Sequence, residues 1–136
     1  MASITWQPGT FRIMTPNGPE HVEGLVGGPF GLRRELQCWH PVWTATHLAT
    51  GMRISLGNGA GFNDLALAQE FAERVLPLAD WNTGVAPRAD NAVADQVVAI
   101  WNELIERDVV AANMTIRASY APPPPENRAT RRSKHR

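Results

Sequence analysis

The sequence contains a single cysteine, a single lysine and no long apolar run, and these shortages exclude several classes of protein. Cys38 has no second cysteine to pair with, so a domain stabilised by internal disulfide bonds is excluded. Charged residues interrupt each apolar stretch well short of the about 20 residues that a membrane-spanning helix needs. The N-terminus lacks a basic start followed by an apolar segment, so no signal peptide is predicted. We therefore expect a cytoplasmic protein.

Charge is unevenly distributed although the net charge is zero. Residues 1–120 carry eight arginines and twelve acids, a net charge of −4, whereas residues 121–136 carry five cations and one acid, a net charge of +4. Four consecutive prolines follow Ala121 in the second segment, and alanine is its largest other apolar residue. We predict one folded domain over residues 1–120 and a disordered, proline-rich basic tail over residues 121–136.

The first half of the chain has the composition of β-structure. A turn at Pro8-Gly9 is expected inside the first strand region, and residues 15–20 predict a second turn whose prolines end the ladder. The glycine-rich residues 21–36 predict one loose strand region. Residues 42–48 and 52–56 are rich in β-branched and apolar side chains and flank an Ala-Thr-Gly turn, which predicts a hairpin.

The second half changes to helical periodicity. Apolar residues at three- and four-residue intervals predict helices over residues 63–79 and 90–107, with Asn63 or Asp64 as the N-cap and a distortion at Pro77. Alternation over residues 114–120 predicts a last, half-buried strand. The expected fold is therefore α+β, with one antiparallel sheet of three to five strands and two amphipathic helices on one face.

Three glycines at alternate positions, Gly57, Gly59 and Gly61, lie between the hairpin and the first helix. A dinucleotide-binding loop requires a third glycine one residue later, where Phe62 stands, and a P-loop requires a Lys-Ser or Lys-Thr pair that is missing. We interpret the loop as a connection, with a weak anion site at the helix start as the alternative. No cofactor is predicted.

Cys38, His40 and His47 lie within ten residues, which raises the hypotheses of a zinc site and of a cysteine nucleophile. A structural zinc site pairs its ligands at short spacing twice, whereas His47 stands alone. A nucleophilic thiolate needs a neighbouring imidazole, but no third group that would orient it can be named. We predict no metal and no catalytic residue; a small hydrolase using Cys38 with His40 or His47 is the third functional hypothesis.

Tryptophan and arginine supply the candidate binding surface, because these residues dominate the energetics of protein interfaces. Aromatic rings beside arginines also stack nucleobases, although the acidic body disfavours nucleic acid. The candidates for binding a protein partner are Trp39, Trp43, Arg33, Arg34 and Arg53. The candidates for binding nucleic acid are the cations of the tail, Arg128, Arg131, Arg132, Lys134 and Arg136.

Part of the chain resembles small proteins of unknown function from phages, prophages and plasmids, in which a Trp-x-x-Thr-His-x-x-Thr-Gly hairpin precedes a helix rich in alanine and glutamate. The matching residues are Trp43, Thr46, His47, Thr50 and Gly51, then Ala68, Phe71, Ala72, Glu73 and Leu76. Residues 127–132 are similar to the basic ends of actinobacteriophage gene products. The resemblance covers about a third of the chain. It implies a mobile-element context and no particular activity.

The leading hypothesis is a non-enzymatic accessory protein of a phage or mobile element. Its folded body would bind an unidentified protein partner, and its tail would add positive charge. The alternative is a nucleic-acid-binding regulator that uses the tail together with aromatic residues of the sheet. The sequence does not indicate an oligomeric state.

Overall fold

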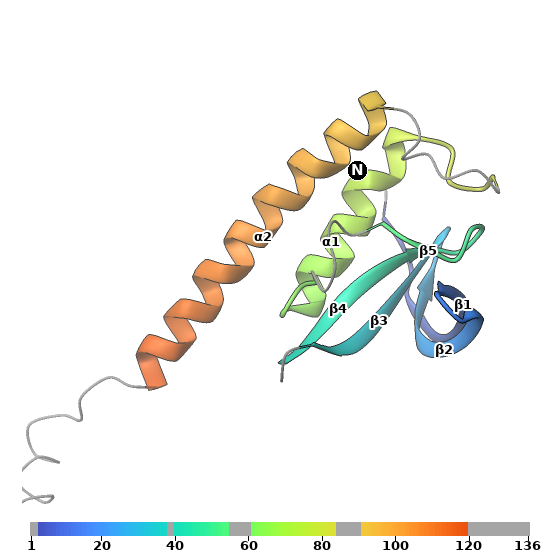
Figure 1. Cartoon of the computed structure of the whole chain (residues 1–136). Helices are drawn as coiled ribbons and strands as arrows, with labels where there is room; N and C mark the ends of the chain where they lie inside the picture. Colours follow the sequence, from blue (N-terminus) through green and yellow to red (C-terminus); the bar gives the residue numbers. More distant parts are fainter. Residues whose placement is uncertain (1–2, 38–39, 55–60, 84–90, 120–136) are drawn as a thin grey trace, which may run out of the picture.

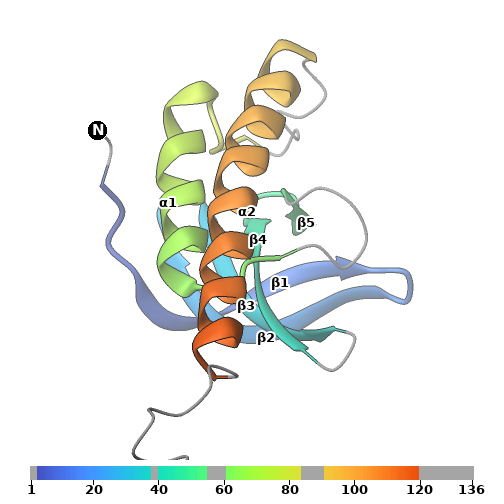
Figure 2. The same cartoon turned by 90° about the vertical axis from the view of Figure 1, so that its left-hand side faces the viewer.

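The computed structural model describes residues 3–37, 40–54, 61–83 and 91–119. A five-stranded antiparallel sheet with the strand order β1-β2-β3-β4-β5 precedes two helices, which both lie over one face of the sheet (Figures 1 and 2). The predicted α+β class is thus confirmed. The strands are β1 (Gln7–Thr15), β2 (Gly18–Gly27), β3 (Phe30–Gln37), β4 (His40–His47) and β5 (Met52–Arg53). The helical elements are α1 (Leu65–Val75), the 3-10 turn η1 (Leu76–Leu78) and α2 (Asn91–Ser119).

The apolar core lies between the sheet and the helices. Phe30 and Leu32 project into it from β3 and are fully buried. The rings of Phe62, Phe71 and Trp101 contact one another, with centroid separations of 4.7 to 5.7 Å. Because a buried aromatic ring removes a large apolar area from water, this cluster fixes both helices onto the sheet.

Two prolines lie inside strands, where the sequence had indicated turns. Pro8 pairs with Leu25 across β1 and β2, and Pro19 pairs with Met14, so the predicted turn at Pro8-Gly9 and the predicted end of the ladder near Pro19 are wrong. The hairpin turns at residues 16–17, which makes Thr15 and Gly18 a hydrogen-bonded pair. The direction of the backbone hydrogen bonds alternates along each strand. Counted from this pair, the nitrogens of Pro8 and Pro19 both point away from the partner strand, so neither position needs an N–H group for the β1–β2 pairing.

The glycine-rich segment forms two strands, whereas the sequence predicted one loose strand region. A turn at Gly28-Pro29 separates β2 from β3, and Gly28 has a φ of +53°, which favours glycine. β2 pairs with β3 at three positions only, from Leu25↔Leu32 to Gly27↔Phe30. Beyond Leu32 the β1–β2 hairpin diverges from β3, as Figure 1 shows.

The start and end of α1 follow the predicted signals. Asp64 is the N-cap, and its side chain accepts a hydrogen bond from the backbone N–H of Ala66 at 3.0 Å. Pro77 lies in η1, where the α-helix tightens into a 3-10 turn, so the predicted distortion is confirmed.

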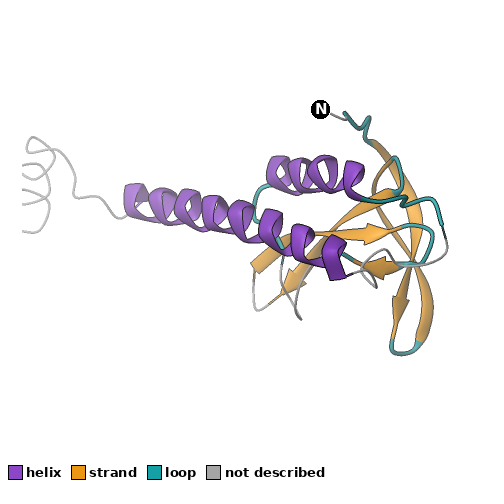
Figure 3. Cartoon of the chain, turned by 90° about the horizontal axis from the view of Figure 1, so that it is seen from above, coloured by secondary structure: helices purple, strands orange, loops and turns teal. Residues whose placement is uncertain are grey.

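α2 is longer than predicted and replaces the expected strand over residues 114–120, which is wrong. Residues 91–119 contain no glycine or proline to end a helix, and Ala111 and Ala112 favour its continuation. Twenty-nine residues make α2 about 43 Å long, against about 16 Å for the eleven residues of α1. Residues 109–119, which we name the overhang, therefore extend past α1 and the sheet (Figure 3). No helix within the described ranges is long and apolar enough to cross a membrane.

Candidate functional site

The outer edge of β3 is open beyond Leu32, since within the described chain no strand pairs with it there on the β2 side. On the other side, β4 pairs with β3 along its whole length. In β4, the backbone groups of Trp43 and Ala45 form hydrogen bonds with Phe62 and Ile54, on the side away from β3. The even-numbered residues of β4 therefore form the hydrogen bonds to β3, and their partners in β3 are odd-numbered. The backbone N–H and C=O groups of Arg34 and Leu36 consequently point to the open side.

The side chains along this edge combine an apolar group with a cation. Leu36 is 76% exposed, the highest value among the large apolar residues of the described chain. Arg34 is also exposed, and it forms no ion pair with any described residue. Strand alternation places both side chains on one face of the sheet, two residues apart. We name Arg34, Leu36 and their outward backbone groups the β3 edge site.

Other sheet edges are protected in ways that this one is not. The outer edge of β1 carries Pro8, and its far end closes onto the turn before β5 because Met14 N–H donates to the Gly51 carbonyl at 2.8 Å. The diverging edge of β2 carries Pro19, and β5 is two residues long. Outward prolines and short strands are devices that prevent strand addition. β3 contains no proline.

The structure divides the residues predicted to bind a protein partner. Arg53 and Arg33 turn to the face opposite the helices, where both contact Glu35. The Nη2 of Arg53 lies 2.7 Å from each carboxylate oxygen, and the Nη1 of Arg33 lies 3.4 Å from Oε1. Trp43 is half-buried against the core, and Trp39 lies outside the described residues. Among the four members that the structure describes, Arg34 is thus the exposed one.

Glu35, which sequence reasoning did not single out, borders a small cavity of about 30 Å³ inside the curl of the sheet. Thr44 and Thr46 line it as buried hydroxyl groups, together with Ile13 and Gly51. Small-molecule sites have volumes of about 300 to 1,000 Å³, so this cavity has room for water alone. Its side chains serve to join β3, β4 and β5.

His47 is buried, and both of its ring nitrogens have partners. Nε2 lies 2.5 Å from the Trp81 carbonyl, which can only accept, so Nε2 is the donor. Nδ1 then accepts from the Thr50 hydroxyl at 2.9 Å. Trp81 is buried in turn and donates from its indole to the Val75 carbonyl. This cluster fastens the β4–β5 turn to the segment after α1, which gives His47 a structural role.

The hydrolase and zinc hypotheses gain no geometric support from the described residues. His40 and His47 occupy opposite ends of β4, about 23 Å apart for an extended strand of that length. No group of three His, Cys, Asp or Glu side chains gathers in a metal-binding arrangement within the described ranges. Cys38 lies outside those ranges.

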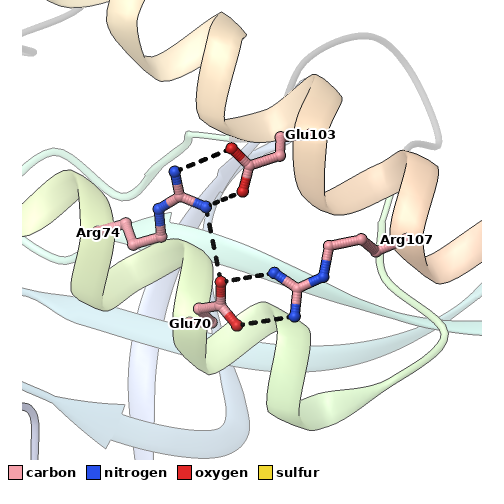
Figure 4. A network of polar contacts seen from close by, with 4 residues as sticks. All are labelled: Glu70, Arg74, Glu103 and Arg107. Carbon is pink, nitrogen blue, oxygen red and sulfur yellow. Dashed lines mark hydrogen bonds and ion pairs between the residues drawn. The ribbon is translucent and has the colours of Figure 1, made fainter.

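Four charged side chains join α1 to α2 on the surface, as Figure 4 shows. Arg74 donates to both oxygens of Glu103 and lies 3.6 Å from Glu70, and Arg107 donates to Glu70 at 2.9 Å. The hydrogen bond from Arg74, aided by its charge, holds the pKa of Glu103 below its ordinary value. This network orients the helices and contains no nucleophile.

Asp108 is a buried acid that sequence reasoning missed. Its carboxylate accepts hydrogen bonds from the backbone N–H of Asn63 at 2.8 Å, from the Asn63 side-chain amide at 3.0 Å and from the backbone N–H of Asp64 at 3.3 Å. A carboxylate beside the start of a helix also interacts favourably with the helix dipole. Asp108 therefore locks α2 onto the start of α1.

Two sequence hypotheses concern residues that the structure describes partly or not at all. Gly57 and Gly59 of the glycine-rich loop lie outside the described ranges, as do the tail cations Arg128, Arg131, Arg132, Lys134 and Arg136. Gly61 is described, and a Cβ atom there would lie 2.8 Å from the Trp43 carbonyl oxygen. This close approach gives Gly61 a packing role beside β4.

Comparisons with models of known protein families, with curated proteins and with solved structures find no match for this chain. The resemblance to phage proteins stays a prediction. Thr50 and Gly51 of the resembling motif have local explanations here, as the partner of His47 and as a turn residue with a φ of +71°.

Proposed function

We propose that this chain is a non-enzymatic interaction module that binds an extended segment of a protein partner along the β3 edge site. The observation that carries the proposal is the open edge of β3, where the backbone groups of Arg34 and Leu36 point outward beside the exposed Leu36 side chain. An added strand gains affinity from main-chain hydrogen bonds and specificity from alternate side chains. The β3 edge site offers both.

The side chains of the site indicate which segment would bind. On the face that carries Arg34 and Leu36, the partner strand would place an acidic residue opposite Arg34 and a large apolar residue opposite Leu36. These two partner residues lie two positions apart, because side chains on one face alternate. The resemblance to phage proteins supports a role as an accessory protein of a phage or mobile element, in the host cytoplasm.

Peptide selection followed by mapping tests this proposal. Peptides selected from a random library against the full chain should be enriched in an acidic and a large apolar residue two positions apart. Nuclear magnetic resonance should show the amides of Arg34 and Leu36 among the most perturbed by such a peptide. Leu36→Pro removes an outward N–H and should weaken binding at least about tenfold, whereas Thr10→Pro, at an outward position of β1, should leave it unchanged.

The proposal fails if selected peptides leave those two amides unperturbed, or if Leu36→Pro binds them as tightly as the unmodified chain. A selection that enriches no peptide would equally contradict it. Leu36→Ala keeps the backbone donor and loses the apolar contact. Its loss of affinity, compared with that of Leu36→Pro, separates the side-chain contribution from the hydrogen bond.

A second candidate function is nucleic-acid binding through the tail, supported by five cations within nine residues. Each phosphate contact releases counterions, so such binding would weaken steeply as salt is raised. Deleting residues 122–136 should abolish binding to single- and double-stranded probes at about 0.05 M salt and leave the melting temperature unchanged. Equal binding by the truncated chain would exclude this role for the tail.

A further inference from the structure

We infer that the β3 edge site also joins two copies of this chain, with β3 of one copy antiparallel to β3 of the other about a two-fold axis at Glu35. This inference rests on the proposed function, because it names what occupies the same site when no partner segment is bound. A strand edge with unpaired N–H and C=O groups is a template for a second copy. Pairing about a two-fold axis requires an edge that is complementary to itself in register, length and charge.

The direction of the backbone groups selects one register. The N–H and C=O groups of Arg34 and Leu36 point to the open side, whereas those of Glu35 bond to β4. With the two-fold axis at Glu35, Arg34 of each copy lies opposite Leu36 of the other. Each of these two pairs exchanges two N–H···O=C hydrogen bonds. All the outward backbone groups of the site are then satisfied.

The open stretch of β3 has the length that this register needs. β2 pairs with β3 as far as Leu32, and β3 ends at Gln37, so residues 33–37 are the part left open. The two-fold register aligns these positions with the same positions of the second copy. Gln37 of the second copy lies opposite Arg33, one position before β2 begins its pairing at Leu32. The pairing of two copies therefore does not compete with β2.

The side chains of Arg34 and Leu36 complement each other in this register. Leu36 is 76% exposed in the single chain and would lie beside the aliphatic part of Arg34 of the second copy, while the guanidinium group stays in water. A shift of the register by two residues in one direction would place Arg34 opposite Arg34, with like charges in contact. The same shift in the other direction leaves Leu36 opposite Leu36 as the one outward pair within β3.

On the other face of the sheet, Glu35 of each copy lies opposite Glu35 of the other. Two carboxylates in this position repel each other, but each is compensated by two arginines of its own chain. Arg53 lies 2.7 Å from both carboxylate oxygens, and Arg33 lies 3.4 Å from one of them. Arg33 is also diagonal to Glu35 of the second copy, at about 7 to 8 Å, which is within reach of a long side chain.

The pairing is weak, which suits a site that must also accept a partner segment. Stable interfaces bury about 1,200 to 2,000 Å², more than two short strand edges provide. A partner segment with an acidic residue opposite Arg34 gains an ion pair that Leu36 of the second copy cannot supply. The partner segment therefore displaces the second copy, which until then protects the open edge from non-specific strand addition.

Sedimentation equilibrium and nuclear magnetic resonance of the full chain, from about 0.02 to about 1 mM, test the inference. We expect a reversible dimer with a dissociation constant of about 0.1 to 1 mM, and concentration-dependent shifts of the Arg34 and Leu36 amides. Leu36→Pro removes an outward N–H from both pairs and should weaken the dimer at least about tenfold. Thr10→Pro, at an outward position of β1, should leave the dissociation constant unchanged.

Two charge variants test the register itself. Leu36→Glu places an acid opposite Arg34 in both pairs, and Leu36→Arg places a cation there, while both variants lose the same apolar contact. The dimer of Leu36→Glu should be about 5- to 50-fold tighter than that of Leu36→Arg at about 0.05 M salt, and the difference should shrink at about 0.5 M. Thr10→Glu and Thr10→Arg are the matched controls, since Thr10 is exposed on β1, and their dissociation constants should be equal.

A chain that stays monomeric at about 1 mM overturns the inference, as do equal dissociation constants for the two Leu36 charge variants. A difference between the Thr10 variants as large as that between the Leu36 variants also overturns it. In each of these cases, selected peptides that perturb the Arg34 and Leu36 amides still support the proposed function. If the dimer forms in this register but no peptide is selected, the inference is supported and the proposed function fails.

Discussion

The two halves of α2 differ in where they lie relative to the rest of the chain. The first half places Val97, Trp101 and Leu104 in the core, binds α1 through the surface ion pairs, and ends on the buried Asp108. The overhang has the same backbone conformation but lies beyond α1 and the sheet. The core contacts and ion pairs that the structure describes for α2 thus lie within residues 91–108.

The two edges of β3 differ in a comparable way. One edge pairs with β4 at eight positions, and the other pairs with β2 at three before the strands diverge. In β3, one edge is thus fixed within the chain, and the other carries the backbone groups on which the proposed strand addition rests. The predictions below test each contrast with matched substitutions.

The largest effect is expected for Leu104→Ala, which removes a fully buried side chain from the first half of α2. It should lower the free energy of unfolding by about 2 to 5 kcal/mol, through lost burial and the cavity left behind. Val109→Ala, five residues further along, removes methyl groups from a side chain that is 49% exposed and should change it by less than about 1 kcal/mol. Urea unfolding measures both. Equal losses would remove the distinction between the two halves.

The two edges of β3 can be compared with one proline each. Arg33 lies opposite Thr44 and bonds toward β4, so Arg33→Pro should destabilise the chain by about 3 kcal/mol. Leu36→Pro removes an N–H from the open edge and should cost less than about 1 kcal/mol. Urea unfolding again gives both values. A Leu36→Pro loss as large as that of Arg33→Pro would mean that the amide of Leu36 is needed within the chain.

A smaller effect is expected where α2 meets α1. Asp108→Ala leaves two backbone N–H groups at the start of α1 without their buried acceptor, which should cost about 1 to 3 kcal/mol. Asp95→Ala, on the exposed surface of the same helix, should change the stability by less than about 0.5 kcal/mol. Thermal unfolding followed by circular dichroism distinguishes the two. If Asp108→Ala leaves the stability unchanged, the contact between Asp108 and the start of α1 does not hold α2 in place where the overhang begins.

Sequence patterns predicted the elements whose signals are local. Helical spacing located α1 and the first half of α2, Asp64 and Pro77 marked the limits of α1, and Gly51 lies in the turn before β5. The hairpin of β4 and β5 was predicted for the same reason, since β-branched residues flank a short turn. These signals depend on neighbours in the chain and on intrinsic conformational preference.

The features that carry the candidate sites depend on contacts between distant segments. Pro8 and Pro19 look like turn residues until the pairing of β1 with β2 shows that their nitrogens point to unpaired edges. Residues 114–120 alternate over too few positions to distinguish a strand from a helix already under way. The exposure of Leu36 follows from the divergence of β2, which no local pattern in β3 encodes. Asp108 was missed because its partners lie 44 and 45 residues earlier.

The surface ion pairs between α1 and the first half of α2 give the smallest expected effect. Glu103→Gln removes a carboxylate whose pKa in the folded state lies below its ordinary value of 4.5, chiefly because of the hydrogen bond from Arg74. A depressed carboxylate pKa stabilises the fold above the unfolded-state value, and this contribution is lost as the pH falls through the folded-state pKa. The melting temperature of Glu103→Gln should therefore lie about 1 to 3 °C below that of the unmodified chain at pH 7. The difference should shrink as the pH falls below 4.5.

Glu106→Gln is the matched control for this titration, since Glu106 lies on the same exposed surface of α2 and forms no ion pair with the described residues. Its melting temperature should follow that of the unmodified chain from pH 7 into the acid range. If both glutamine variants lose the same stability at pH 7, the effect arises from the charge of the helix as a whole. The first half of α2 would then owe its position to the core and Asp108 alone, which would sharpen its contrast with the overhang.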